Sequence, residues 1–181
     1  MPSEQVQNFA RAAHDVGLAV WYGGTVFGKF ALNPAVKSIQ DETARGQAAN
    51  AAWGAFHPLG GVGLAAAAVV RFTARQTELQ PVNLSPTEKV LATAGDVLMV
   101  SAIGLTLASG VYGQRLASKG SVPMESGTQP AAGTPPEVAK LQKSNEVLGN
   151  STVLAGLGLL TVQAIQDRVS FSRPSKKRLF R

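Results

Sequence analysis

Apolar residues gather in four long stretches that are separated by polar connections. The stretches are Val16–Leu32, Ala51–Val70, Val90–Tyr112 and Val147–Ile165. They hold 79 of the 181 residues but only two of the 28 Lys, Arg, Asp and Glu side chains, Lys29 and Asp96. A helix needs about 20 mostly apolar residues to cross the roughly 30 Å of hydrocarbon in a bilayer. The pattern therefore predicts an all-α protein, an integral membrane four-helix bundle that forms one domain over residues 1–181.

A soluble, Ala-rich helical bundle is the alternative interpretation of the same pattern. The mean hydropathy is only +0.07, because the apolar stretches use Ala and Gly and many polar residues lie between them. However, apolar runs of 17 to 23 residues with so few charges are longer than the core helices of soluble proteins need to be. Their length favours the membrane interpretation.

The longest connection, Gly113–Glu146, divides into two parts. Residues 113–135 are rich in Gly, Pro, Ser and Thr, a composition that cannot bury a core, so we expect a flexible outer loop. The loop is interpreted as a mobile tether, and a partner-docking segment is the alternative. From Pro136 onward the sequence is typical of a helix that starts with proline in its first turn.

Two other connections carry signals for helix ends. Asn33-Pro34 is expected to stop the first helix, because the residue before a proline disfavours the helical conformation. Ser85 or Thr87 is expected to cap the third helix, since a side-chain oxygen there can accept from a free backbone N–H.

Basic residues outnumber acidic ones and cluster at the C-terminus. The formal net charge is +6, the pI is near 10, and six of the 17 basic residues follow Gln166. Residues 166–181 therefore resemble a basic cytoplasmic tail, in which Lys176, Lys177 and Arg178 would contact anionic lipid head groups. No RNA- or DNA-binding motif accompanies the tail, so nucleic acid is not an expected partner.

The distribution of positive charge predicts an orientation in the membrane. Four spans place both ends on one side, and if that side is cytoplasmic the inner segments carry ten Lys and Arg residues against six outside. Because positive residues favour the cytoplasmic side, the expected topology is N-in/C-in. The N-terminus lacks a basic region and an obvious cleavage site, so the first apolar stretch is interpreted as a retained anchor.

Small residues recur at four-residue spacing within the apolar stretches. Gly24 and Gly28 form one such pair, and Gly61 and Gly104 are each followed by an alanine four residues later. This spacing lines one helix face with little side chain, so helix backbones can approach closely. Packing between the four helices is the expected role of these glycines, and a dimer face is the alternative.

Three polar residues are candidates for an intramembrane site: His14, Asp96 and His57. A carboxylate in hydrocarbon is costly and normally has a partner, a water molecule or a proton, which makes Asp96 the first candidate for function. In the expected topology His14 and Asp96 share the inner half, so His14 or nearby backbone could pair with Asp96. An equally weighted alternative is that Asp96 only fixes helix register through hydrogen bonds.

Two histidines on two spans raise the question of a haem. His14 at the inner edge and His57 in the outer half would be about 15 Å apart along the membrane normal, which argues against a haem b bridging them. A single axial ligand stays open as an alternative. The sequence contains no cysteine, no His/Asp/Glu cluster with metal-ligand spacing and no nucleophile motif, so neither a cofactor nor a metal is expected. Lys29 is expected to extend to the membrane interface.

The N-terminal part of the chain resembles a known family. The segment RAAHDVGLAVWYGGTVFGKFALNPAV, followed by Trp53 and His57 before a glycine-rich run, is similar to an uncharacterised family of small four-helix actinobacterial membrane proteins. The matching residues of the segment are His14, Gly17, Trp21, Tyr22, Gly23, Gly24, Gly28 and Asn33. The match covers residues 11–72, and a looser similarity to transmembrane protein 205-type proteins is also present. The resemblance implies a four-helix fold and a bacterial plasma membrane location, and it implies no activity.

These observations lead to two hypotheses about function. The first is a non-enzymatic accessory or scaffold subunit, which would contact the lipid bilayer and associate with other membrane protein subunits or with itself. It is motivated by the lack of a catalytic constellation beside several small-residue helix faces. The alternative is a membrane enzyme or carrier that binds a lipid, quinone or haem through Asp96, His14 and His57.

Overall fold

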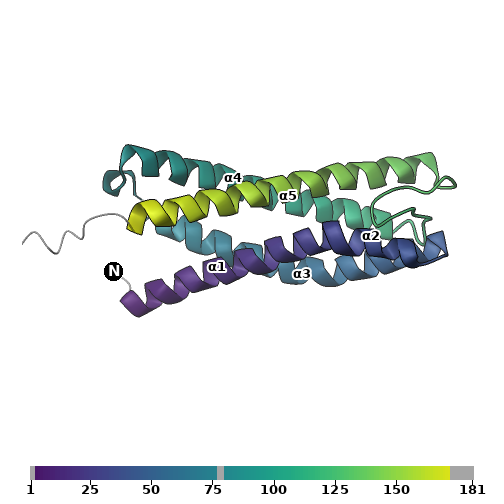
Figure 1. The fold of residues 1–181 in the computed structure, drawn as a ribbon, viewed down its shortest axis with the longest axis horizontal. Coiled ribbons are helices and arrows are strands. Elements are labelled where there is room, and N and C mark those ends of the chain that lie inside the picture. The colour runs from purple at the N-terminus through teal and green to yellow at the C-terminus, as the bar shows by residue number, and fades with distance from the viewer. Residues whose placement is uncertain (1–2, 77–79, 172–181) are drawn as a thin grey trace, which may run out of the picture.

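The structure is a computed structural model that describes residues 3–76 and 80–171. Within these ranges the chain forms no strand and four long helices: α1 Glu4–Phe27, α3 Glu42–Arg75, α4 Pro86–Ala117 and α5 Pro136–Phe171 (Figure 1). Short helical turns lie between them: a π-helical turn at Gly28–Leu32, α2 at Asn33–Ala35, and 3-10 turns at Val36–Ser38 and Pro81–Asn83. The predicted all-α fold is confirmed.

Sequence signals explain where the helices begin and end. Ser85 caps α4 through a capping box, because its hydroxyl accepts from the Glu88 N–H at 3.4 Å and its own N–H donates to the Glu88 carboxylate at 2.9 Å. The cap is therefore Ser85 and not Thr87. The predicted stop at Asn33-Pro34 is wrong, since the helical path continues until Ile39 becomes extended. Pro34 lies in the first turn of α2, directly after the π-helical turn Gly28–Leu32.

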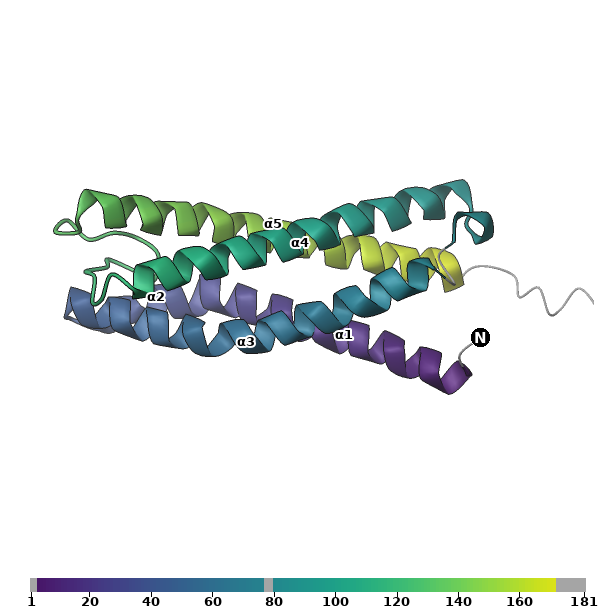
Figure 2. The ribbon, with the colours of Figure 1, turned by 180° about the vertical axis from the view of Figure 1, so that it is seen from behind.

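The four long helices run up and down and form two pairs. α1 packs on α3, α4 packs on α5, and Figures 1 and 2 show the pairs as two layers. We call the end that carries α2 and the connection between α4 and α5 the capped end. The opposite end, where α1 begins and α5 finishes, is called the terminal end (Figure 1).

A close backbone approach joins α1 to α3 in the first pair. A Cβ atom added to Gly17 would lie 2.3 Å from the carbonyl oxygen of Gly63, and one added to Gly63 would lie 2.7 Å from the carbonyl oxygen of Gly17. Any side chain at either position would force the helices apart. The core beside this contact joins all four helices through Leu18, Trp21, Leu64, Ala67, Ala68, Met99, Ala102 and Leu159.

Three of the described helices, α3, α4 and α5, are long and apolar enough to cross a membrane. Helix α1 does not meet the same measure, since it begins with polar residues and its α-helical part ends at Phe27. Large apolar side chains cover the outside of the bundle, including Val62, which is 70% exposed, and Leu154, which is 69% exposed. This surface fits contact with lipid, whereas a soluble bundle would expose polar side chains.

Candidate functional site

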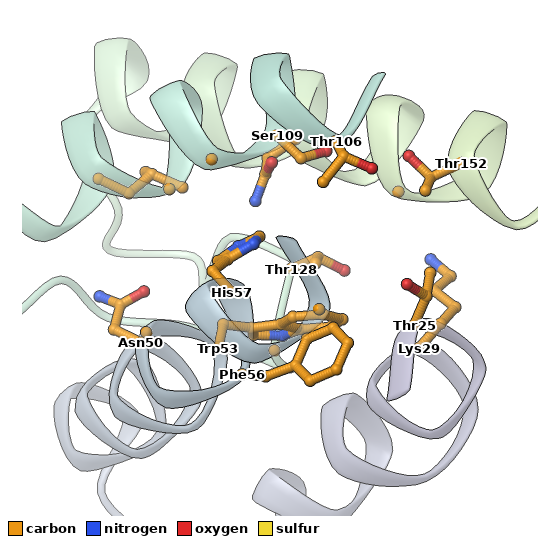
Figure 3. A pocket seen from close by; sticks show the side chains of 18 of the residues that line it. Thr25, Lys29, Asn50, Trp53, Phe56, His57, Thr106, Ser109, Thr128 and Thr152 are labelled. Atoms are coloured by element: carbon orange, nitrogen blue, oxygen red, sulfur yellow. The ribbon is translucent and has the colours of Figure 1, made fainter. Parts of the chain in front are cut away.

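A cavity of about 450 Å³ lies between the two helix pairs in the half of the bundle next to the capped end (Figure 3). Each helix contributes residues at helical spacing, so that one face of each helix lines it. On α1 and its continuation these residues are Trp21, Thr25, Lys29 and Asn33, each four positions after the last. This volume is within the range of small-molecule binding sites.

Aromatic side chains of α3 form one wall of the cavity. The ring centroids of Trp53 and His57 are 5.8 Å apart, and those of Trp53 and Phe56 are 6.0 Å apart. Figure 3 shows the His57 side chain pointing from α3 toward the opposite pair. The indole N–H of Trp53 donates to the Asn33 side-chain oxygen at 2.9 Å, which holds the ring against the beginning of α2.

Polar side chains form the opposite wall. Lys29 lies 3.7 Å from the Glu146 carboxylate on α5, and the two side chains are 19% and 28% exposed. Lys29 therefore points into the bundle and not toward the membrane interface as predicted (Figure 3). Three buried oxygen atoms of lining residues have no hydrogen-bond partner among the described residues: Ser109 Oγ, Gln142 Oε1 and Asn145 Oδ1. Since buried polar groups nearly always have a partner, these atoms indicate that the site is suited to a polar ligand group or to water.

Glycines keep the cavity open. A Cβ atom added to any of five lining glycines would meet nothing within 4 Å; these are Gly54, Gly61, Gly110, Gly113 and Gly149. Several other helical glycines lie against neighbours, as Gly24 does against Phe56 and Gly28 does against Trp53. Glycine therefore serves two purposes in this chain, close packing at some positions and open volume at others.

This division differs from the packing role expected for all four predicted glycines. Gly24 and Gly28 lie against aromatic rings of α3, whereas Gly61 lines the cavity and Gly104 faces open space on the outside of α4. The four-residue spacing shows that small residues share one helix face. It does not show whether that face packs against another helix or borders open space.

Residues 118–135 close the capped end, and we call them the cap segment. The Met124 N–H donates to the Glu42 carbonyl at 3.0 Å, and the Gly127 N–H donates to the Asn33 carbonyl at 3.1 Å. Five of its residues are buried: Val122, Met124, Ser126, Gly127 and Ala131. The stretch was expected to be unable to bury a core, yet Met124 packs with Val36 and Ala49, and Val122 packs with Leu116 of α4 and Val138 of α5. Its flexibility stays a prediction.

Asp96 belongs to a charged cluster near the terminal end. Its carboxylate accepts from Arg71 Nε at 2.9 Å and forms an ion pair with Arg75, whose Nε lies 2.6 Å away. Arg71 is only 3% exposed, and it also donates to the Ala92 carbonyl at 2.8 Å and to the Gln163 side chain at 3.3 Å. The cluster thus connects α3 with α4 and α5.

The three predicted site residues are not brought together. Asp96 pairs with arginines and not with His14, whose Nδ1 lies 3.1 Å from the carboxylate of Asp15. Of the three, only His57 lines the cavity. Lys176, Lys177 and Arg178, predicted to contact lipid head groups, lie outside the described residues.

Sequence reasoning missed most of the cavity-lining polar residues, including Thr25, Thr106, Ser109, Gln142, Asn145, Glu146 and Thr152. The signal was present as uncharged polar residues at three- and four-residue spacing. For example, Gln142, Asn145, Glu146, Gly149 and Thr152 follow one face of α5. Uncharged polar residues are common on helix faces of every kind, so this spacing alone does not mark a cavity.

The arrangement is suited to binding an amphipathic molecule. Aromatic rings and glycines offer apolar surface, while amides, hydroxyls and one ion pair offer polar contacts. Among the described residues no group of three or more His, Cys, Asp or Glu side chains could hold a metal ion. No known protein family, curated protein or solved structure matches this chain.

Proposed function

We propose that this chain is a four-span membrane protein that binds a small amphipathic molecule in the cavity between its two helix pairs. The proposal takes the carrier hypothesis and centres it on His57. The observation that carries it is an open cavity of about 450 Å³ that combines aromatic and polar walls inside a bundle with an apolar exterior. A lipid or a quinone is the corresponding class of ligand.

The polar groups of the cavity suggest how such a ligand would be held. Lys29 and Glu146 offset one another, so the wall carries no large net charge and suits a neutral or zwitterionic head group. His57 can donate or accept one hydrogen bond, and the unpartnered Gln142 and Asn145 oxygens can accept. The ring faces of Trp53 and Phe56 would contact the apolar part of the ligand.

In this proposal His14 and Asp96 have structural roles. Asp96 pairs with two arginines, and its carboxylate compensates the charge of the buried Arg71, which supports the hypothesis that it fixes the arrangement of helices. His14 is buried near the middle of α1 and is not among the cavity-lining residues.

The proposed membrane placement follows the helices. α3, α4 and α5 would be three spans, and Val16–Leu32 would be the fourth because α1 lies alongside α3 through this stretch. Both termini would be cytoplasmic, with the cap segment outside, in a bacterial plasma membrane. An accessory or scaffold role, with other subunits as partners, stays a prediction.

Native mass spectrometry of the detergent-purified protein tests the proposal. A molecule retained by the wild type should be lost from Gly61→Leu, because the new side chain would occupy open cavity volume. Gly104→Leu is the matched control, since Gly104 also faces open space but lies outside the cavity lining. Equal retention by both variants, or no retention by the wild type in any membrane extract, would contradict the proposal.

A further inference from the structure

We infer that the cavity opens sideways between α3 and α4, so that its ligand enters from the hydrocarbon layer of the membrane. The inference rests on the proposed function and adds the source and class of the ligand. The ligand would be a bilayer lipid or a similar long-chain amphiphile, and not a solute from the aqueous phase.

Exposure of the lining residues identifies the open side. Among the residues that line the cavity, the exposed ones are Gly54 and Pro58 on α3 together with Gln114 and Ala117 on α4. The lining residues of α1, α5 and the cap segment are buried or half-buried. The cavity therefore reaches the molecular surface between the two helices that contribute exposed residues.

Open glycines lie along the same side. Gly54 and Gly61 on α3, and Gly110 and Gly113 on α4, all have room for a Cβ atom with nothing within 4 Å. Pro58 lies among them and has no N–H to donate to the Gly54 carbonyl, which leaves a backbone acceptor at the rim. A polar group of an entering ligand could bind this acceptor.

The other exits are closed by specific contacts. Between α1 and α5, the ion pair of Lys29 and Glu146 crosses the gap, and Thr25 and Thr152 are buried. At the capped end, a Cβ atom on Gly127 would lie 2.2 Å from the Asn33 side-chain oxygen, so the cap segment sits directly on the end of the helical path. A solute from water would have to displace these contacts.

Apolar side chains flank part of the opening. Leu59 and Val62 on α3 are 61% and 70% exposed, and Leu107 and Val111 on α4 are 66% and 46% exposed. These side chains follow the same helical turns as the open glycines. An opening bounded by such residues would face acyl chains in a membrane, which supports a membrane-dissolved ligand.

Quenching of the protein's own fluorescence tests the route. The chain has two tryptophans, Trp21 and Trp53, and both line the cavity. In phosphatidylcholine vesicles with brominated acyl chains, the wild type should be quenched relative to ordinary vesicles, while iodide in the water should leave it unquenched. Gly113→Leu should remove most of the quenching, and Gly104→Leu on the outer face of α4 should retain all of it.

Gly149→Leu separates failure of the route from failure of the proposed function. This variant fills the cavity from α5, on the side away from the inferred opening. If it removes quenching while Gly113→Leu does not, the cavity binds lipid but the inferred route is wrong. If iodide quenches the wild type and brominated lipid does not, the ligand comes from water and the inference is wrong. If none of the variants changes quenching by brominated lipid, both the route and the lipid ligand are wrong.

Discussion

The two helix pairs are joined by different kinds of contact at the two ends of the bundle. At the terminal end, a buried arginine crosses from α3 to α4 and α5 and is neutralised by Asp96. At the capped end, open glycines leave the pairs apart around the cavity, and the half-buried ion pair of Lys29 and Glu146 and the cap segment connect them instead. A buried charged cluster packs the helices together at the terminal end, whereas a single half-buried ion pair at the capped end leaves the cavity open beside it. The charged cluster and the cavity thus lie in different halves of the same four helices.

The largest expected effect is at the terminal end. Asp96→Leu would leave Arg71 buried without its carboxylate, and should lower the free energy of unfolding by about 3–5 kcal/mol. Asp96→Asn should cost less, because an amide oxygen can still accept from one arginine. Melting in detergent would measure both, and adding Arg71→Met to Asp96→Leu should recover part of the loss. A wild-type melting temperature for Asp96→Leu would show that the charges do not hold this end.

The next effect concerns the bridge at the capped end. Met124 is 1% exposed and packs with Val36 and Ala49, so Met124→Ala should cost about 2–4 kcal/mol. Lys119→Ala is the control, since Lys119 is an exposed residue of the same segment. If both substitutions leave the melting temperature unchanged, the cap segment is the mobile tether that its composition suggests.

A smaller loss is expected where α1 meets α3. Gly17→Ala would place a methyl group against the Gly63 carbonyl and should destabilise the protein by about 1–3 kcal/mol. Gly23→Ala on the same helix has open space and should be neutral or stabilising. Similar melting temperatures for the two variants would argue against the close approach of the helices.

The smallest expected change is an increase in the free energy of unfolding, not a decrease. Gly149→Ala should stabilise the unliganded protein by about 0.5–1 kcal/mol, because alanine favours the helix and its methyl group meets no neighbour within 4 Å. The same substitution should reduce retention of an amphipathic ligand, as measured by native mass spectrometry. Loss of stability instead would show that this side of the cavity is already packed.

The elements of the fold could be predicted from the sequence, but the arrangement could not. The four apolar stretches fall within the four long helices or, for the first, run on through the π-helical turn. Each helix extends beyond its apolar stretch, because charged residues continue the helix once it has left the apolar region. Arg71 illustrates the consequence: it follows the second stretch by one residue and was counted as a connection, yet it lies on α3 and is buried.

The cavity could not be predicted from the sequence, for a different reason. Helical spacing shows which residues share a face, and it does not show which two faces remain apart. Gly61 and Gly63 are two residues apart in one glycine-rich run, but Gly63 touches Gly17 and Gly61 faces the cavity. His57 could be selected as a rare polar residue in an apolar stretch, whereas Thr25 or Ser109 carried no comparable signal alone.

The π-helical turn at Gly28–Leu32 determines the direction in which the following side chains point around the helix axis. Residues four apart on an α-helix drift around its axis by about 40°, so a line of Trp21, Thr25, Lys29 and Asn33 would gradually rotate out of the cavity. The wider turn absorbs this drift just before Asn33, whose side chain binds Trp53 and whose backbone binds Gly127. Removal of one residue from this turn would rotate Asn33 by about 100° and uncouple the aromatic wall from the cap segment. The π-helical turn therefore fixes the orientation of Asn33, so that this residue contacts both the aromatic wall of the cavity and the cap segment.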